Sequence, residues 1–473
     1  MGQIPLANGF YQSESLPLSN QRCINAYPHI NEAPALSEQS LIGCGGLTQL
    51  TTTGVGEVNR GAWSKNGIPY FVNGTSLYRV TRSVAPDGTE TFTATDVGTV
   101  AGTGRVWMRN NPTQLMILNT DGAGYIYNED DGTPFQQITD SNFTGQGTPR
   151  ALEFIDGYFV VTTDNKIVHS NLNDGLTYNA LDYGDAESDP DGIVAPVVVQ
   201  NQLYIIGEYT TEGFSNVGGS GFVFKRNNVF IDKGCVAPFS VINANQTFFM
   251  IGKTKQETPT VWMFTGSDYK RVSTSAIEDI LMSVTDTELA DAHAIYYGTN
   301  GHYFVNFKFG PHTVAYDLVT QRWHERQSYE DEGYVNWRVS SITEAYGRIM
   351  VADTQDGRIG EIDKDVYAEY SNILPVEFSL QPFYSNKGLA LPALELTMES
   401  GVGNDDVVDP QVSLQISKDG KTFGSERKRS IGKKGEYNRR IVWRRNGRAD
   451  RFAVLKFKMT DKANRVFIRL DAD

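Results

Sequence analysis

Apolar and polar positions follow a pattern that recurs seven times between residues 58 and 363. Each copy holds an apolar stretch, a turn centred on Gly or Asn, a second apolar stretch, and a strand-like segment that ends in polar residues. The clearest copies occupy residues 60–80, 105–128, 151–170 and 342–363, and looser copies lie near 192–208, 241–264 and 291–317. Short apolar segments separated by such turns are typical of β-strands.

The period of this pattern predicts a β-propeller. The first strands of successive copies lie near Ala62, Val106, Phe154, Ala195, Asn243, Ala294 and Ser340. Their spacing of roughly 45 residues is that of a four-stranded propeller blade. Each unit exposes two apolar faces that only neighbouring units can cover, so the copies must close into a ring. We therefore expect an all-β fold in which residues 58–365 form about seven blades. Six blades are the alternative, because two copies are imperfect and the N-terminal segment could complete a blade.

The chain has other patterns on either side of the repeats. Residues 1–57 are rich in Pro, Asn, Ser and Gly without sustained alternation, which predicts an extended N-terminal arm that packs across the ring or a neighbouring subunit. Residues 375–473 predict a β-sandwich. Its six expected strands are 376–385, 389–400, 410–420, 435–445, 451–461 and 465–473. Only residues 273–294 have the spacing of a short amphipathic helix pair.

Charge separates the two predicted domains. Residues 375–473 carry 19 Lys and Arg against 13 Asp and Glu, a net charge of +6, whereas residues 1–374 carry 23 against 43, a net charge of −20. A propeller of this sign repels nucleic acid as a whole. The densest basic segment, residues 426–448, has two open interpretations: a solvated strand face, or an interface with an acidic protein surface or with DNA phosphate.

Four arginines in this basic segment form the candidate partner interface: Arg439, Arg440, Arg444 and Arg445. Strand alternation places Arg439 and Arg445 on the face of Trp443, and it places Arg440 and Arg444 on the opposite face. Both faces therefore carry arginine. We expect at least one of the four to pair across a subunit contact.

No short motif for catalysis or cofactor binding is complete. Residues 251–254, IGKT, resemble the end of a phosphate-binding loop, but Thr247 stands where the leading Gly is required. Glu187, Asp189 and Asp191 have calcium-loop spacing, but Val198 replaces the bidentate acid, which leaves at most a weak metal site near Asp189 and Asp191. We expect no catalytic, cofactor-binding or metal-binding residues and no enzymatic activity. A carboxylate pair for glycoside hydrolysis could still assemble in space without a linear trace.

Cysteine content and hydropathy bear on the compartment. Cys23, Cys44 and Cys235 are odd in number and widely spaced, which fits neither a disulfide framework nor a zinc site. We expect reduced and mostly buried thiols. No apolar core follows a basic start, and no run of 18 apolar residues occurs, so we expect a soluble protein without a signal peptide or a membrane anchor.

Several segments resemble one protein family in the order in which they occur. They are residues 13–28 (SESLPLSNQRCINAYP), 192–214, 233–240 (KGCVAPFS), 271–278 (RVSTSAIE) and 435–461. Together they resemble the packaged-DNA stabilisation proteins of short-tailed bacteriophages, also called tail hub, nozzle or head completion proteins. The likeness runs from near residue 13 to the C-terminus, and its motifs are structural.

This resemblance implies a structural virion protein made of a propeller and a sandwich and assembled in the host cytoplasm. It implies a homo-oligomeric ring, a hexamer, below the portal and the adaptor or connector proteins of the head-to-tail junction. The ring would close the filled head, stabilise the packaged DNA and dock a tail needle, tailspikes or fibres. During ejection, DNA would pass through its channel without sequence-specific binding.

The alternative is a glycan-binding or glycan-cleaving tail propeller. It rests on aromatic residues that could stack on sugars, namely Trp63, Tyr70, Trp107, Trp262 and Trp323. Such side chains more often fill the core between blades. We therefore favour the structural tail protein.

Overall fold

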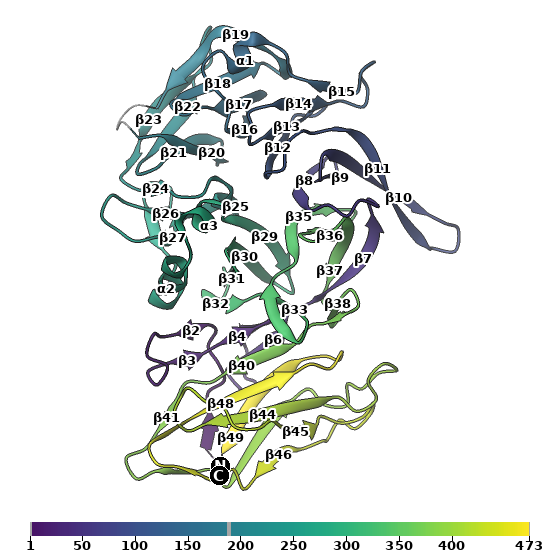
Figure 1. Ribbon diagram of the computed structural model, residues 1–473, viewed down its shortest axis with the longest axis vertical. Helices are drawn as coiled ribbons and strands as arrows, with labels where there is room; N and C mark the ends of the chain where they lie inside the picture. Colours follow the sequence, from purple (N-terminus) through teal and green to yellow (C-terminus); the bar gives the residue numbers. More distant parts are fainter. Residues whose placement is uncertain (1, 187–190, 473) are drawn as a thin grey trace.

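The computed structural model describes residues 2–186 and 191–472 and consists of a ring of small sheets joined to a sandwich (Figure 1). Both chain termini lie at the end of the sandwich that is farthest from the ring. The helices of the described residues are short: α1 (Ser141–Thr144), α2 (Ser275–Ser283) and α3 (Asp286–Ala290). The predicted helix pair in residues 273–294 is confirmed, and so is the all-β class.

Seven sheets of the described residues form the blades of the propeller. The first comprises β8 (Asn59–Lys65), β9 (Ile68–Asn73), β10 (Ser76–Val84) and β11 (Glu90–Thr99), and the second comprises β12 (Val106–Asn110), β13 (Leu115–Asn119), β14 (Gly124–Tyr127) and β15 (Phe135–Gln137). The third comprises β16 (Ala151–Ile155), β17 (Tyr158–Thr162), β18 (Lys166–Asn171) and β19 (Asp174–Asp185), and the fourth comprises β20 (Ile193–Val199), β21 (Gln202–Gly207), β22 (Thr211–Asn216) and β23 (Phe224–Ile231). The sixth comprises β29 (His293–Thr299), β30 (His302–Phe309), β31 (His312–Asp317) and β32 (Arg322–Glu325). Neighbouring strands within these blades are antiparallel.

Tight turns explain why the repeated sequence folds into these hairpins. The first and second strands of three blades are joined by the pairs Asn66-Gly67, Asp156-Gly157 and Asn300-Gly301, and all six residues have positive φ. Two-residue turns with positive φ at both positions match the twist of the flanking strands, and they favour Asn-Gly and Asp-Gly. These turns are the recurring Gly- and Asn-centred positions of the sequence pattern.

The fifth blade departs from the repeat. Its inner edge is divided between β24 (Gly234–Cys235) and β25 (Ile242–Ala244), which both pair with β26 (Thr247–Lys253), followed by β27 (Thr260–Phe264) and β28 (Tyr269–Arg271). A 3-10 turn, η1 (Pro238–Ser240), lies between the two short strands. The Ser240 hydroxyl accepts a hydrogen bond from the Ile251 amide at 3.1 Å, which supplies an acceptor where the inner strand is interrupted.

The seventh blade is completed by the N-terminal segment. It comprises β35 (Val339–Ala345), β36 (Arg348–Asp353), β37 (Arg358–Asp363) and, as its outer strand, β7 (Gly46–Thr52), which pairs antiparallel with β37. The propeller thus has seven blades. The expected arm at residues 1–57 is not a separate element, because its strands belong to both the propeller and the sandwich. Pairing between segments about 300 residues apart leaves no local sequence pattern.

The sandwich contains two sheets. One has the order β46 (Ile441–Arg444), β43 (Ala393–Met398), β49 (Val466–Ala472), β6 (Gln39–Gly43) and β5 (Ala26–Ile30), with β1 (Gly2–Ile4) also on β49. The other runs β4 (Cys23–Ile24), β40 (Val376–Ser379), β48 (Phe452–Met459), β44 (Gln411–Ser417) and β45 (Arg427–Ser430). Strand β41 (Phe383–Tyr384) also pairs with β48. Separate two-stranded pieces are β2 (Tyr11–Gln12) with β3 (Asn20–Gln21), β33 (Gln327–Glu330) with β34 (Gly333–Asn336), and β42 (Leu389–Ala390) with β47 (Arg448–Ala449). Strands β38 (Ala368–Glu369) and β39 (Asn372–Ile373) extend the sheet of the seventh blade beyond β7. Aromatic rings fill the core, with Phe378 at 4.8 Å from Phe467 and 5.3 Å from Phe457 between centroids.

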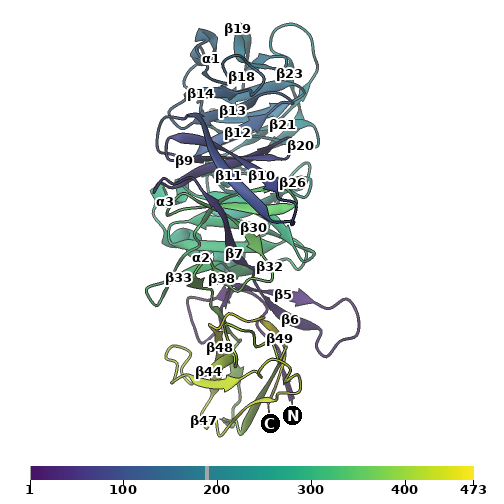
Figure 2. The ribbon, with the colours of Figure 1, turned by 90° about the vertical axis from the view of Figure 1, so that its right-hand side faces the viewer.

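Strand β4 connects the two domains. It pairs in parallel with β32 of the sixth blade through Ile24 and Glu325, and antiparallel with β40 of the sandwich. Beside it, the Arg22 guanidinium donates to both carboxylate oxygens of Glu325 at 2.5 and 2.8 Å. Continuous backbone pairing therefore runs from the propeller into the sandwich, whose position below the ring is visible from the side in Figure 2.

One predicted strand of the sandwich is much shorter than expected. Residues 435–445 were expected to form one strand, but only Ile441–Arg444 do so. Gly432 and Gly435 have positive φ, and the Glu436 amide donates to the Lys433 carbonyl at 2.8 Å, so this part of the chain turns instead. Strand β45 was not predicted, because its sequence RKRS has no apolar alternation.

Candidate functional site

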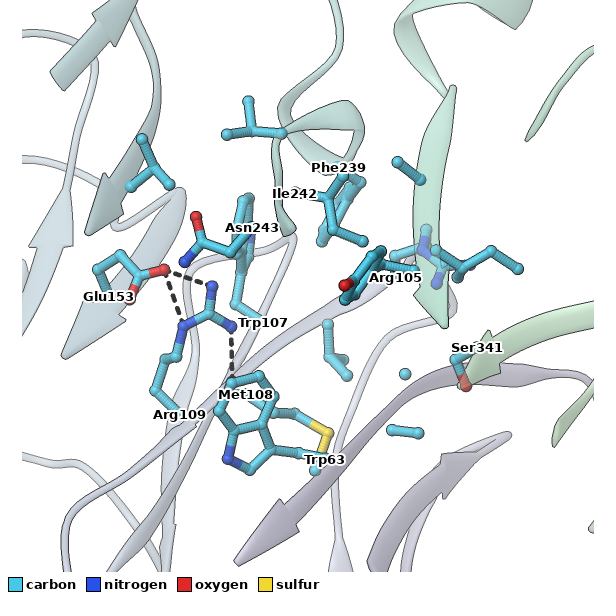
Figure 3. A pocket seen from close by; sticks show the side chains of 18 of the residues that line it. Trp63, Arg105, Trp107, Met108, Arg109, Glu153, Phe239, Ile242, Asn243 and Ser341 are labelled. Atoms are coloured by element: carbon cyan, nitrogen blue, oxygen red, sulfur yellow. Dashed lines mark hydrogen bonds and ion pairs between the residues drawn. The ribbon is translucent and has the colours of Figure 1, made fainter. Parts of the chain in front are cut away.

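The inner strands of all seven blades surround a cavity of about 530 Å³ on the propeller axis (Figure 3). Its walls include Trp63, Arg105, Trp107, Arg109, Glu153, Phe239, Asn243, Tyr296 and Ser341. A volume of this size is typical of a small-molecule site.

One side of this axial cavity holds a compensated ion pair. The Arg109 guanidinium donates to Glu153 Oε1, with the Arg109 Nε atom at 2.9 Å (Figure 3). The same guanidinium lies over the Trp63 ring, 4.7 Å from its centroid. The Glu153 side chain is 4% exposed, so its charge depends on this arginine.

The other side of the axial cavity holds an arginine without an acidic partner in the described residues. Arg105 donates to the Ser340 hydroxyl at 3.2 Å and to the Ser340 carbonyl at 3.1 Å. Burial lowers the pKa of Arg105 to about 10. Its guanidinium lies 5.8 Å from the centroid of Phe239, and the Phe239 ring stacks on Trp107 at 4.7 Å. The turn η1 therefore brings Phe239 to the axis beside this cation.

The sequence did not single out these axial charges. Arg109 and Glu153 are 44 residues apart, close to one repeat, and they occupy the inner strands of neighbouring blades. A comparison of the repeats for charges at the innermost strand would have found them. Of the five aromatic residues of the glycan alternative, Tyr70, Trp107, Trp262 and Trp323 are buried, as expected of core residues. Trp63 is half-buried, and Trp63 and Trp107 line the axial cavity.

The second charged feature is the basic edge of the sandwich, which we define as Arg427 and Arg429 of β45 with Arg439, Arg440, Arg444 and Arg445 around β46. Strands β45 and β46 are the edge strands of the two sheets, and they lie against each other. The Arg427 and Arg429 side chains donate to the Arg444 and Val442 carbonyls at 2.8 and 3.0 Å. These bonds cover the outer edge of β46 and gather positive charge there.

The four arginines of the candidate interface are all exposed. Arg440 forms an ion pair with Glu395 at 2.5 Å, and this contact lowers the pKa of Glu395. Arg444 ends β46 and is exposed, whereas its neighbour Trp443 is buried. The expected alternation over all four arginines is wrong, because Arg439 and Arg440 precede the strand and Arg445 follows it with φ of 58°.

The incomplete motifs have structural roles. Residues 247–253 form β26, so IGKT does not form a phosphate loop. The Asp191 carboxylate accepts from the amides of Tyr209 and Thr210 at 2.8 and 3.0 Å and stabilises a turn. Glu187 and Asp189 lie outside the described residues. Within residues 2–186 and 191–472, no group of three or more His, Cys, Asp or Glu side chains is placed to hold a metal ion.

The three cysteines lie away from the axial cavity lining. Cys23, Cys44 and Cys235 are free and buried, as expected, and burial raises the pKa of Cys235 to about 11. Among the described helices, none has the length and apolar character needed to cross a membrane.

Fold and site together define a protein built from a seven-bladed propeller with a small axial cavity and a sandwich with a basic edge. The family model described as "Bacteriophage P22 Gp10, beta-propeller" matches residues 2–367, and the model described as "Bacteriophage P22 Gp10, beta-sandwich" matches residues 380–473. The chain belongs to this P22 Gp10 family. It is a structural component of the phage tail hub and thus of the virion.

One curated relative and two solved structures are similar to the chain in different degrees. The chain is 22% identical to the tail hub protein gp10 of Salmonella phage P22 over 409 residues, which cover 84% of this chain and 85% of that protein. The WD40 β-propeller domain of Doa1 is 11% identical, with a TM-score of 0.40 over 67% of this chain and 97% of that chain. BamB from Moraxella catarrhalis is 11% identical, with a TM-score of 0.37 over 72% and 97% of the two chains.

Proposed function

We propose that six copies of this chain form a ring in the phage tail that closes the filled head and retains the packaged DNA. Adaptor proteins would bind the ring from the side of the head, and a needle, spikes or fibres would dock on it. The observation that carries this proposal is the similarity to the tail hub protein of phage P22, which spans 84% of the chain and includes both domains in the same order.

The axial cavity bears on the route of the DNA. Its volume of about 530 Å³ suits a small ligand, and side chains from all seven blades line it, so a DNA duplex does not fit there. In the proposed ring, the DNA channel therefore lies between subunits. The net charge of −20 on residues 1–374 would let DNA slide along propeller walls without adhering.

The basic edge is the proposed contact between the sandwich and an acidic partner surface. The sandwich residues carry a net charge of +6, and the propeller residues of a neighbouring copy supply the opposite sign. Arg439 and Arg444 are exposed and are the best residues to vary, because Arg440 already pairs with Glu395 inside the subunit.

Charge reversal at the basic edge tests the proposal. The double variant Arg439→Glu with Arg444→Glu should fold normally, because exposed charges contribute little to stability. It should join filled heads poorly, since like charges across a contact are strongly unfavourable, and added salt should partly restore assembly. The readouts are ring formation in electron micrographs and nuclease-accessible DNA in particles.

The matched control is Arg322→Glu, which changes an exposed arginine of the propeller. If the double variant forms rings and retains DNA as well as the wild type, the basic edge is a solvated face. If the wild-type protein with its tail partners forms no ring in micrographs, the proposed assembly itself is wrong.

We further propose that the protein acts without enzymatic turnover. Glu153 is held by Arg109 rather than paired with a second free carboxylate, which does not favour glycoside hydrolysis. Incubation with lipopolysaccharide, peptidoglycan or a sialoside should release no more reducing sugar than buffer does. Release that disappears in a Glu153→Gln variant would support the glycan-active alternative.

A further inference from the structure

The axial cavity contains an arginine whose hydrogen bonds in the described residues use only part of its donors. Arg105 directs two donors to Ser340, whereas a guanidinium has five. The Phe239 ring lies between this guanidinium and the Trp107 ring, 5.8 Å from the former and stacked at 4.7 Å on the latter. A ligand beside Arg105 therefore meets an aromatic wall.

A second cation is buried near Arg105. The Lys308 ammonium donates to the Val339 carbonyl at 2.6 Å, next to the Ser340 group that holds Arg105. Burial and, after it, the charge of Arg105 lower the pKa of Lys308 to about 7, although the carboxylates of Asp353 and Glu369 act in the opposite direction. The nearest acid of the cavity wall, Glu153, is already paired with Arg109. A buried charge without a partner is costly, and an anionic ligand would remove that cost.

We propose that the axial cavity binds a carboxylate group, with the Arg105 guanidinium as its charged donor. A planar carboxylate matches the fork of a guanidinium. Among the charged residues lining the cavity, Arg109 and Glu153 cancel and Arg105 leaves one positive charge, so a monoanion is favoured over the more highly charged phosphate. This site is independent of the proposed ring.

The carboxylate has two sources, a peptide segment of a partner protein or a small free acid. The aromatic walls made by Trp107, Phe239 and Tyr296 favour a peptide, which would fill the remaining volume with apolar side chains. Acetate and two tripeptides distinguish the sources. The tripeptides are Gly-Gly-Phe with a free C-terminal carboxylate and the same sequence as the amide.

The test uses the full-length protein labelled with ¹⁵N at its six tryptophans. Titrations at pH 8 keep Lys308 mostly neutral, and constant ionic strength removes general salt effects. The resonance absent from a Trp107→Phe variant identifies the Trp107 indole. It should shift saturably with acetate and with the free-acid peptide but not with the amide. Tighter binding of the peptide than of acetate assigns the site to a peptide carboxylate, and equal binding assigns it to a small acid.

Arg105→Gln should weaken carboxylate binding at least tenfold, while the exposed Arg322→Gln should bind as the wild type does. Unchanged resonances of the other tryptophans show that Arg105→Gln is folded. If that variant unfolds, calorimetry on Arg105→Lys gives an independent readout, because this change keeps the positive charge but loses the planar fork and should also weaken carboxylate binding. No saturable shift with acetate or the free-acid peptide, or tighter binding of inorganic phosphate than of acetate, overturns the proposal.

Discussion

Removal of the Leu47 side chain tests whether β7 is an integral strand of the seventh blade. Leu47 is 1% exposed and packs in a core cluster with Cys44, Trp337 and Ile362. Its carbonyl also accepts from the Tyr370 amide at 2.9 Å. Truncation of a buried Leu to Ala costs about 2–5 kcal/mol, because apolar transfer energy is lost and a cavity remains. Leu47→Ala should therefore lower the free energy of unfolding of the propeller by about this amount.

The matched control is Gln49→Ala, on the same strand but exposed. It should change the free energy of unfolding by less than about 0.5 kcal/mol. Urea unfolding followed by circular dichroism measures both variants. Amide hydrogen exchange should show faster exchange in β35, β36 and β37 for Leu47→Ala and not for Gln49→Ala. If the two variants have the same small effect, β7 is only loosely attached and the seventh blade is stable without it.

Two further predictions concern titratable groups. Burial lowers the pKa of His324 from its usual value near 6.5 to about 3, so the unfolded chain takes up a proton that the folded chain does not. The free energy of unfolding should thus fall as the pH drops below about 6.5, by up to about 1.4 kcal/mol per pH unit from this group, and His324→Gln should reduce that slope in urea titrations between pH 7 and 5. Burial also raises the pKa of Cys44 and of Cys235, so a thiol reagent at pH 8 should label neither in the folded protein and both in urea; rapid labelling without urea would show that these cores open.

The repeated part of the fold was predictable from the sequence because its information is local. Turn pairs such as Asn66-Gly67 and the apolar strands beside them lie within a few residues of each other, and their period identifies the blade. The interrupted inner strand of the fifth blade was not predictable, because Phe239 and Ser240 sit in a short apolar stretch that resembles any other strand. The pairings that attach residues 1–57 to the two domains, such as those of β7 with β37 and of β6 with β49, depend on partners hundreds of positions away.

The two candidate sites also differ in how far the sequence predicts them, because one depends on local sequence and the other on contacts between distant blades. The exposure of Arg439, Arg440, Arg444 and Arg445 follows from their charge, and a charge-rich segment is visible in any sequence. Their arrangement was only partly correct, since the left-handed conformation of Arg445 ends the alternation. The contact of Arg105 with Ser340 joins the second blade to the seventh, and only closure of the ring brings these residues together.

The pairing of β7 with β37 has a consequence for synthesis of the chain. Thr52 leaves the ribosome about 300 residues before Arg358, its partner in the register. At about 5–20 residues per second, the first-made strand waits on the order of 15–60 seconds for the last-made strands of the propeller. Strands β5 and β6 wait longer still, because their sheet needs Val466 and Phe467. A prematurely terminated chain can complete neither domain and exposes unpaired strand edges, so only full-length copies present the surfaces on which a tail could be built.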